Sequence, residues 1–105
     1  MKRSLPTSGN FRVTSPVDAT NLNDGVALPN GVILPWIGFG TYGLGKDKSY
    51  DSTLKALQAG YRCIDTAFIY AGEKTELQVG AAIQDAVESK VLKRREDVFL
   101  ITKHW

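Results

Sequence analysis

Three side chains suited to acid–base chemistry stand at the ends of apolar runs. The run 62–64 leads into Asp65, Tyr70 follows five residues later, and the run 98–102 leads into Lys103. If both runs are parallel strands of one sheet, Asp65 and Lys103 lie at its carboxyl edge, where α/β proteins build active sites. Tyr70 then lies in the loop above Asp65. A carboxylate, a phenol and an ammonium are therefore predicted to converge on one pocket.

Short apolar runs predict the strands of this sheet and a hairpin before it. Residues 26–28 and 32–34 flank Pro29-Asn30-Gly31, and an Asn-Gly turn between apolar runs is a strong hairpin signal because both residues tolerate positive φ. The run 98–103 has no polar alternation, which predicts burial on both faces of that strand. The strands of the main sheet are predicted over residues 36–40, 62–65 and 98–103.

Two amphipathic segments predict helices between these strands. Apolar residues recur at helical spacing from Ser49 to Tyr61, where Gly60 supplies a stop. The second helix is predicted from Thr75 to Ser89, with Thr75 and Gln78 placed for a capping box. A hairpin followed by strand, helix, strand, helix and strand predicts an α/β fold built from right-handed crossovers.

Composition is that of a soluble globular domain. The chain has 105 residues, of which 43% are hydrophobic and 23% charged, and its formal net charge of +2 gives no case for nucleic-acid binding. Cys63 is the single cysteine, which rules out a disulfide framework and favours a reducing compartment such as the cytoplasm. No apolar run approaches the ~20 residues that cross a membrane, and we expect no metal in the site.

The first residues differ from the rest of the chain. Residues 1–24 are polar and include Lys2, Arg3 and Arg12, with no acidic residue before Asp18. We predict a disordered tail over 1–24 and a folded domain over 25–105, because terminal polar segments rarely bury enough apolar surface to fold. An organelle transit peptide is the alternative, although the segment lacks an amphipathic stripe.

A dinucleotide-binding Rossmann unit is one interpretation of the first strand. Residues 38–43 read Gly-Phe-Gly-Thr-Tyr-Gly, which matches G-x-G-x-x-G, and Asp65 ends the next strand at a suitable distance. A Rossmann helix begins inside the glycine motif so that its amino terminus can hold the pyrophosphate. Here residues 44–48 intervene before any helical pattern, and a hairpin precedes the first strand, so this interpretation is kept only as an alternative.

From Val26 to Trp105 the sequence resembles the amino-terminal part of the aldo-keto reductases. The motifs occur in the family's order: the hairpin, Gly38-Phe39-Gly40-Thr41-Tyr42, Gly60-Tyr61-Arg62-x-Ile64-Asp65-Thr66-Ala67 with Tyr70 beyond it, Val79-Gly80-x-Ala82-Ile83, and Phe99-Leu100-Ile101-Thr102-Lys103-x-Trp105. The resemblance implies an eight-stranded (β/α)8, or TIM, barrel preceded by a hairpin. The chain would hold its N-terminal part, an incomplete barrel. Cys63, where the family often has histidine, and a longer loop after Tyr70 are departures.

The resemblance also implies a reaction, the NAD(P)H-dependent reduction of aldehydes and ketones to alcohols. Tyr70 would be the general acid, Lys103 would increase the acidity of the phenol, and Asp65 would hold Lys103 in place. The cofactor, NADP (NADPH) with NAD as the alternative, would be held by Gly40, Thr41, Tyr42 and Asp65. Tyr42 and Trp105 would wall the pocket of a small carbonyl substrate.

One lysine is sufficient for this role on energetic grounds. A free phenol has a pKa of ~10, and lowering it by two to three units takes about 3–4 kcal/mol. An ammonium ~4 Å away supplies roughly 4 kcal/mol at an effective dielectric constant near 20.

The resemblance leaves other expectations open. His104 is not expected to be catalytic, because a residue next to Lys103 on a strand points to the opposite face. The full-length parent is expected to be a monomer, and the 105-residue chain alone to be an inactive fragment. A non-catalytic, cofactor-binding regulatory protein of the same fold is the second function class.

Overall fold

The computed structural model describes residues 11–104. Trp105 and residues 1–10 lie outside the described residues, so the predicted role of Trp105 as a wall of the substrate pocket is not tested. Within residues 11–104, no helix is both long and apolar enough to cross a membrane.

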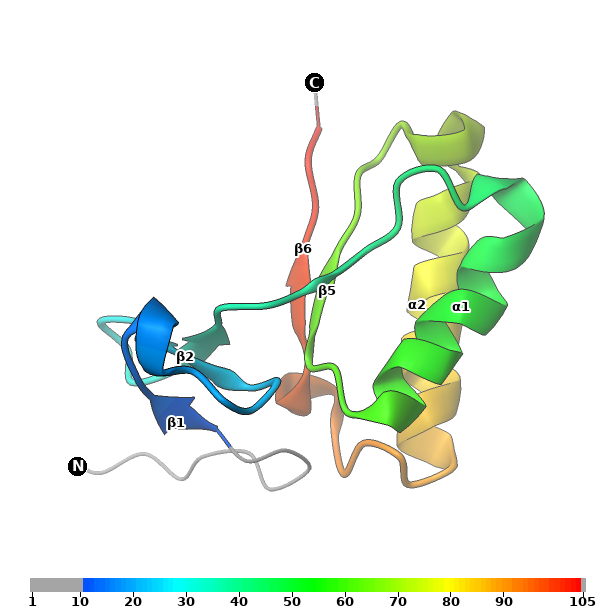
Figure 1. Cartoon of the computed structure of the whole chain (residues 1–105). Coiled ribbons are helices and arrows are strands. Elements are labelled where there is room, and N and C mark those ends of the chain that lie inside the picture. Colours follow the sequence, from blue (N-terminus) through cyan, green and yellow to red (C-terminus); the bar gives the residue numbers. More distant parts are fainter. Residues whose placement is uncertain (1–10, 105) are drawn as a thin grey trace.

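The main sheet has three parallel strands, in the spatial order β4-β5-β6. They are β4 (Phe39–Gly40), β5 (Cys63–Asp65) and β6 (Phe99–Ile101). The helices α1 (Gly45–Ala59) and α2 (Lys74–Glu88) lie together on one side of β5 and β6 (Figure 1). Each helix links two neighbouring parallel strands, as predicted for consecutive crossovers. The α/β arrangement is that of part of a β/α barrel.

The hydrophobic core lies between this sheet and the two helices. Its apolar side chains come from β5, from one stripe of each helix and from the segment that joins α2 to β6. The buried members are Leu57, Ile64, Val79, Ile83, Ala86, Leu92 and Val98. The predicted apolar stripe of the second helix is therefore confirmed, with Val87 packed at its margin.

The strand β6 differs from its prediction. All three of its residues are half-buried, so the expectation of burial on both faces is wrong for this structure. Leu100 packs against the core beneath the helices. Ile101 borders a hollow of about 260 Å³ on the opposite face of the sheet, which no helix of residues 11–104 covers. The apolar run of β6 therefore has one face packed against the core and a second face that residues 11–104 leave partly exposed.

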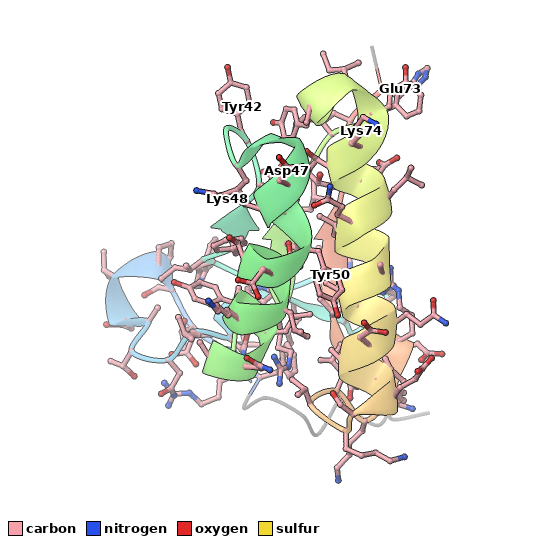
Figure 2. All side chains as sticks on the ribbon, turned by 90° about the vertical axis from the view of Figure 1, so that its right-hand side faces the viewer. Tyr42, Asp47, Lys48, Tyr50, Glu73 and Lys74 are labelled. Carbon is pink, nitrogen blue, oxygen red and sulfur yellow. The ribbon has the colours of Figure 1, made fainter. Side chains whose placement is uncertain are left out.

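The helix α2 begins within one residue of its predicted start, whereas α1 begins earlier than predicted. The helix α1 begins at Gly45 rather than Ser49, and the sequence missed its first turn because that turn is polar and carries no apolar periodicity. The capping box predicted at Thr75 and Gln78 is wrong, since neither side chain caps α2. Thr75 Oγ1 instead accepts a hydrogen bond of 3.3 Å from Ser49 Oγ, and Gln78 Oε1 accepts one of 3.0 Å from the Tyr50 amide. The two side chains join the helices to each other, and Tyr50 lies between them (Figure 2).

A second sheet lies beside the amino ends of the parallel strands. It consists of β1 (Arg12–Val13), β2 (Asp24–Ala27) and β3 (Ile33–Pro35), with β2 and β3 antiparallel. The predicted hairpin is confirmed, although only Gly31 of the turn has positive φ, at 86°. Asn23 Nδ2 donates to the Gly60 carbonyl at 3.1 Å, which ties this sheet to the turn before β5. Short 3-10 helices occupy Pro16–Asp18, Tyr70–Glu73 and Arg95–Asp97.

Residues 11–24 are folded, so the disordered tail predicted over 1–24 is wrong for this part. The strand β1 pairs in parallel with β2, and the Asp24 side chain is completely buried. Its carboxylate accepts two hydrogen bonds from the Arg12 guanidinium, at 2.9 and 2.7 Å, and two from the amides of Thr20 and Asn21. The hydrogen bond from Arg12 is the main cause of a lowered pKa of Asp24, and burial opposes it. A buried carboxylate with four donors holds a segment that has little apolar surface.

Replacing Asp24 with Asn is expected to release β1 from the hairpin. Because its pKa is lowered on folding, the Asp24 carboxylate stabilises the protein above the usual aspartate pKa of ~4, and this contribution is lost as the pH falls below it. The protection factor of the Thr14 amide, which donates to Gly25 O at 3.0 Å, is the intrinsic exchange rate at each pH divided by the observed rate, and it is expected to fall in Asp24→Asn and on acidification of the wild type. Lys55→Gln, which removes the exposed Asp51–Lys55 pair, is the control, and exchange as slow in Asp24→Asn as in that control would contradict the assignment.

Candidate active site

The predicted acid–base residues Asp65 and Lys103 meet at the carboxyl edge of the main sheet. Asp65 is the last residue of β5, and Lys103 lies two residues beyond the end of β6. Lys103 Nζ donates to Asp65 Oδ1 and, at 2.9 Å, to the carbonyl oxygen of Thr66. The ammonium is therefore held by two oxygens from consecutive residues of one strand end. Their side chains remain partly open to solvent, with 38% of Lys103 and 47% of Asp65 exposed.

Tyr70 lies beside this ion pair. Lys103 Nζ is 5.7 Å from the centre of the Tyr70 ring. The ring also packs edge-on against Tyr42, with 5.2 Å between the ring centres. Directly after Tyr70, residues 71–73 all have positive φ, which bends the longer loop noted in the sequence back into α2. The structure thus brings the three groups together, although Tyr70 and Asp65 border different hollows rather than the one pocket predicted.

The electrostatics favour a permanent cation at this site. The hydrogen bond to Asp65 is the main cause of a raised pKa of Lys103, desolvation opposes it, and the charges of Asp65 and Tyr70 add to it. A raised pKa keeps the ammonium protonated from neutral into alkaline pH. An ammonium next to a phenol stabilises the phenolate and so makes the phenol a better proton donor.

The residues from the end of β4 onward, which are predicted to hold the cofactor, alternate between exposed and buried. Gly40 is exposed, and a Cβ atom built on it would meet no other atom within 4 Å. Thr41 is only 1% exposed, and its hydroxyl donates to the carbonyl oxygen of Asp65 at 3.1 Å. Tyr42 is 81% exposed. Figure 2 shows Tyr42 at the same end of the molecule as Asp47 and Lys48, which belong to the first turn of α1, and Glu73 and Lys74, where α2 begins.

Two hollows flank the predicted residues. A cavity of about 560 Å³ lies between the loop after β4 and the loop after β5, and it is lined by Tyr42, Gly43, Gly45, Ile69, Tyr70, Ala71 and Thr75. The hollow on the uncovered face of the sheet is bordered by Gly40 and Asp65. Tyr70 and Asp65 thus face different hollows, with Lys103 between them.

Ile69 and Thr75 were not among the predicted site residues. Ile69 is 53% exposed, an unusual exposure for a large apolar side chain, and its place directly before Tyr70 was the available signal. Thr75 was assigned to a helix cap, and no sequence signal indicated that it lines a cavity.

Two basic residues near the site, Arg62 and His104, contact other parts of the fold. Arg62 is buried, and its guanidinium donates to the carbonyl oxygens of Leu57, Tyr61 and Val91. Burial lowers the pKa of Arg62, and the Asp97 carboxylate opposes that shift. His104 is exposed and stacks on Phe68, with 4.9 Å between the rings. Within residues 11–104, no three His, Cys, Asp or Glu side chains form a group that could hold a metal ion.

Comparison with known proteins identifies the family. A model described as "Aldo/keto reductase family" matches residues 36–105. The chain is 42% identical over 83 residues to mouse aldo-keto reductase family 1 member C13, which covers 76% of this chain and 24% of that protein. It is 38% identical over 90 residues to the aldehyde reductase YPR1 of Saccharomyces cerevisiae, covering 86% of this chain and 26% of that protein.

A solved structure agrees with these sequence matches. The structure of a Bombyx mori aldo-keto reductase in complex with NADP superposes with a TM-score of 0.65 and 32% identity, over 76% of this chain and 27% of that one. The chain therefore spans about a quarter of the length of the relatives it matches. The family match and the solved structure exclude the Rossmann alternative. The chain belongs to the aldo-keto reductase family.

Proposed function

We propose that the protein containing this chain reduces aldehydes or ketones to alcohols with NADPH. The observation that carries this proposal is the contact of Lys103 with both the Asp65 carboxylate and the Tyr70 ring at the carboxyl edge of the sheet. A purely structural segment has no need for a partly exposed ammonium held beside a phenol. The experiments use the complete protein, defined as a whole β/α barrel that contains this chain.

The proposed roles follow from the positions of the groups. Tyr70 donates its phenolic proton to the carbonyl oxygen of a substrate bound beside Lys103 at the carboxyl edge of the sheet, next to the cofactor. Lys103 stabilises the phenolate that remains, and Asp65 keeps the ammonium in place. Tyr42 is an exposed aromatic side chain that packs on Tyr70 and contributes to substrate binding.

The uncovered face of the sheet suits a nicotinamide cofactor. The open space beside Gly40 lets a flat ring approach the backbone, and the Asp65 side chain borders the same hollow. When bound there, the cofactor supplies the hydride. Gly40, Tyr42 and Asp65 are proposed to contact it, whereas the side chain of Thr41 is buried and is not. NADP is preferred over NAD because the Bombyx mori relative was solved with NADP.

The complete protein also has a proposed oligomeric state, location and set of partners. We propose a monomer in the cytoplasm that acts on a small carbonyl compound and binds neither nucleic acid nor membrane. The single cysteine, Cys63, is buried as a free thiol, which suits a reducing compartment.

Hydride transfer by the complete protein tests the function. With NADPH deuterated at the nicotinamide C4 position and an aldehyde such as 4-nitrobenzaldehyde, deuterium is expected at the carbinol carbon of the alcohol. The 105-residue chain alone is expected to form no product, because three of eight strands leave the cofactor too few contacts to offset the ~4–15 kcal/mol cost of association.

Two results would contradict these expectations. A complete protein that binds NADPH yet reduces none of a panel of aldehydes and ketones would support the non-catalytic regulator instead. Turnover of an aldehyde by a monomeric 105-residue chain would show that the remaining strands are not needed.

A further inference from the structure

We propose that Thr41 is a positioning residue, whose buried hydroxyl fixes the Asp65–Thr66 peptide and, through it, the two oxygens that hold the Lys103 ammonium. The inference rests on the proposed function, since it names a supporting residue of the same site. It assigns the Thr41 hydroxyl to the protein interior, where the resemblance implied a contact with the cofactor.

The first observation is the double hydrogen bond from Thr41 to a single carbonyl. The Thr41 amide donates to Asp65 O at 3.0 Å, and the Thr41 hydroxyl donates to the same oxygen at 3.1 Å. The amide bond continues the ladder in which Gly40 pairs with Asp65. The hydroxyl occupies the second lone pair of that oxygen, so the carbonyl at the end of β5 has no remaining acceptor capacity.

The second observation is that the same peptide is held from its other side. The Thr66 amide donates to Ile101 O on β6 at 2.8 Å. The peptide that joins Asp65 to Thr66 is therefore held by three hydrogen bonds, two accepted from Thr41 and one donated to β6, just where β5 ends. Its orientation determines where the Asp65 side chain and the Thr66 carbonyl point.

These two groups are the ones that hold the ammonium. Lys103 Nζ donates to Asp65 Oδ1 and to Thr66 O. In the described part of the chain, the titratable groups that act on Lys103 are the Asp65 carboxylate and the Tyr70 phenol. A small rotation of the clamped peptide changes both contacts of the ammonium at once, and with them its distance from the Tyr70 ring.

The burial of Thr41 separates this role from direct binding. It is 1% exposed, directly after the edge strand β4. The neighbours Gly40 and Tyr42 are exposed, as the alternation along an extended segment requires. A hydroxyl enclosed in this way reaches a bound nucleotide only if the loop after β4 rearranges.

Three substitutions in the complete protein test the proposal. Thr41→Val keeps the shape of the side chain and removes its donor, whereas Thr41→Ser keeps the donor and removes a methyl group. Thr53→Val is the matched control, because Thr53 is also a fully buried threonine of this unit but its hydroxyl has no partner among the described residues. Each variant is assayed for kcat, for the Kd of NADPH, and for the titration of Lys103 by competitive acetylation without cofactor.

Thr41→Val is expected to lower kcat by about fivefold, the effect of one lost hydrogen bond of ordinary strength. The Kd of NADPH is expected to change less than twofold, and Lys103 to titrate at lower pH because its carboxylate contact loosens. Thr41→Ser is expected to restore the wild-type titration, and Thr53→Val to leave all three measurements unchanged.

Contrary outcomes separate the two proposals. A Thr41→Val variant with weakened NADPH binding and an unmoved Lys103 titration would overturn the positioning role in favour of a cofactor contact. If the complete protein reduces none of the aldehydes and ketones tested, the proposed function fails, while the Lys103 titration still decides whether Thr41 orders the ammonium.

Discussion

Tyr70→Phe in the complete protein is expected to lower kcat for aldehyde reduction by about 10³-fold, within the range of ~10²–10⁴ that a general acid contributes. The substitution removes the proton that the substrate oxygen receives and keeps the ring that packs against Tyr42. The phenol makes little contribution to holding the nucleotide, so the Kd of NADPH is expected to stay within twofold. Steady-state kinetics and a fluorescence titration with NADPH measure the two quantities.

The matched control for this prediction is Tyr61→Phe, the same chemical change at a structural tyrosine. Tyr61 is half-buried, and its ring packs edge-on against Phe39 with 6.0 Å between the ring centres. It is expected to leave kcat unchanged. If Tyr70→Phe keeps more than a tenth of the wild-type kcat, Tyr70 is not the acid.

Lys103→Met is the second large effect, and it is expected to change the shape of the pH–rate profile. Without the ammonium the phenol holds its proton more tightly, so the alkaline limb is expected to move to higher pH and kcat to fall about 10²-fold at neutral pH. Asp65→Asn is expected to give a milder defect of the same kind, since Asp65 acts by holding Lys103. Profiles from pH 5 to 10 with a saturating aldehyde provide the measurement.

The Lys103–Asp65 pair also makes the stability of the fold depend on pH. Folding raises that pKa above 10.5, mainly through the hydrogen bond to Asp65. The stabilising contribution of the pair is therefore complete below pH ~10 and is lost as the pH rises through the raised value. Lys55→Met removes a lysine from an exposed pair and is the control, with an unchanged profile expected. A Lys103→Met profile with the wild-type shape would exclude Lys103 from setting the acidity of the phenol.

The residues that carry the chemistry could be identified from the chain because they follow apolar runs. A strand end is marked by the change from apolar to polar side chains, and parallel strands place these ends at one edge. Asp65, Tyr70 and Lys103 could therefore be grouped before any coordinates were known, and the structure brings them into contact. The hairpin with its turn at residues 30–31 could also be predicted from the sequence, because its turn signal is local.

The helix starts were decided by contacts between helices. Thr75 and Gln78 have the spacing of a capping box, yet both side chains bind α1 instead. The spacing of residues in the sequence shows which hydrogen bonds a side chain could make within its own helix. Only the packed structure shows which partner from another helix lies close enough to compete. The start of α1 was missed for a different reason. Its first turn is helical from Gly45 but polar, so it shows no apolar periodicity.

Long-range polar contacts account for the remaining differences. Residues 11–24 look disordered from composition alone, but the buried Asp24 carboxylate collects donors from Arg12, Thr20 and Asn21. Thr41 is a small polar residue in a glycine-rich loop, and its burial against the Asp65 carbonyl depends on the pairing of β4 with β5. The sequence by itself determined the type and order of the elements and the chemical groups at their ends, because apolar periodicity is a local property. Only the tertiary structure decided which polar groups pair, because a hydrogen bond between residues far apart in the chain exists only once the strands and helices that carry them have packed together.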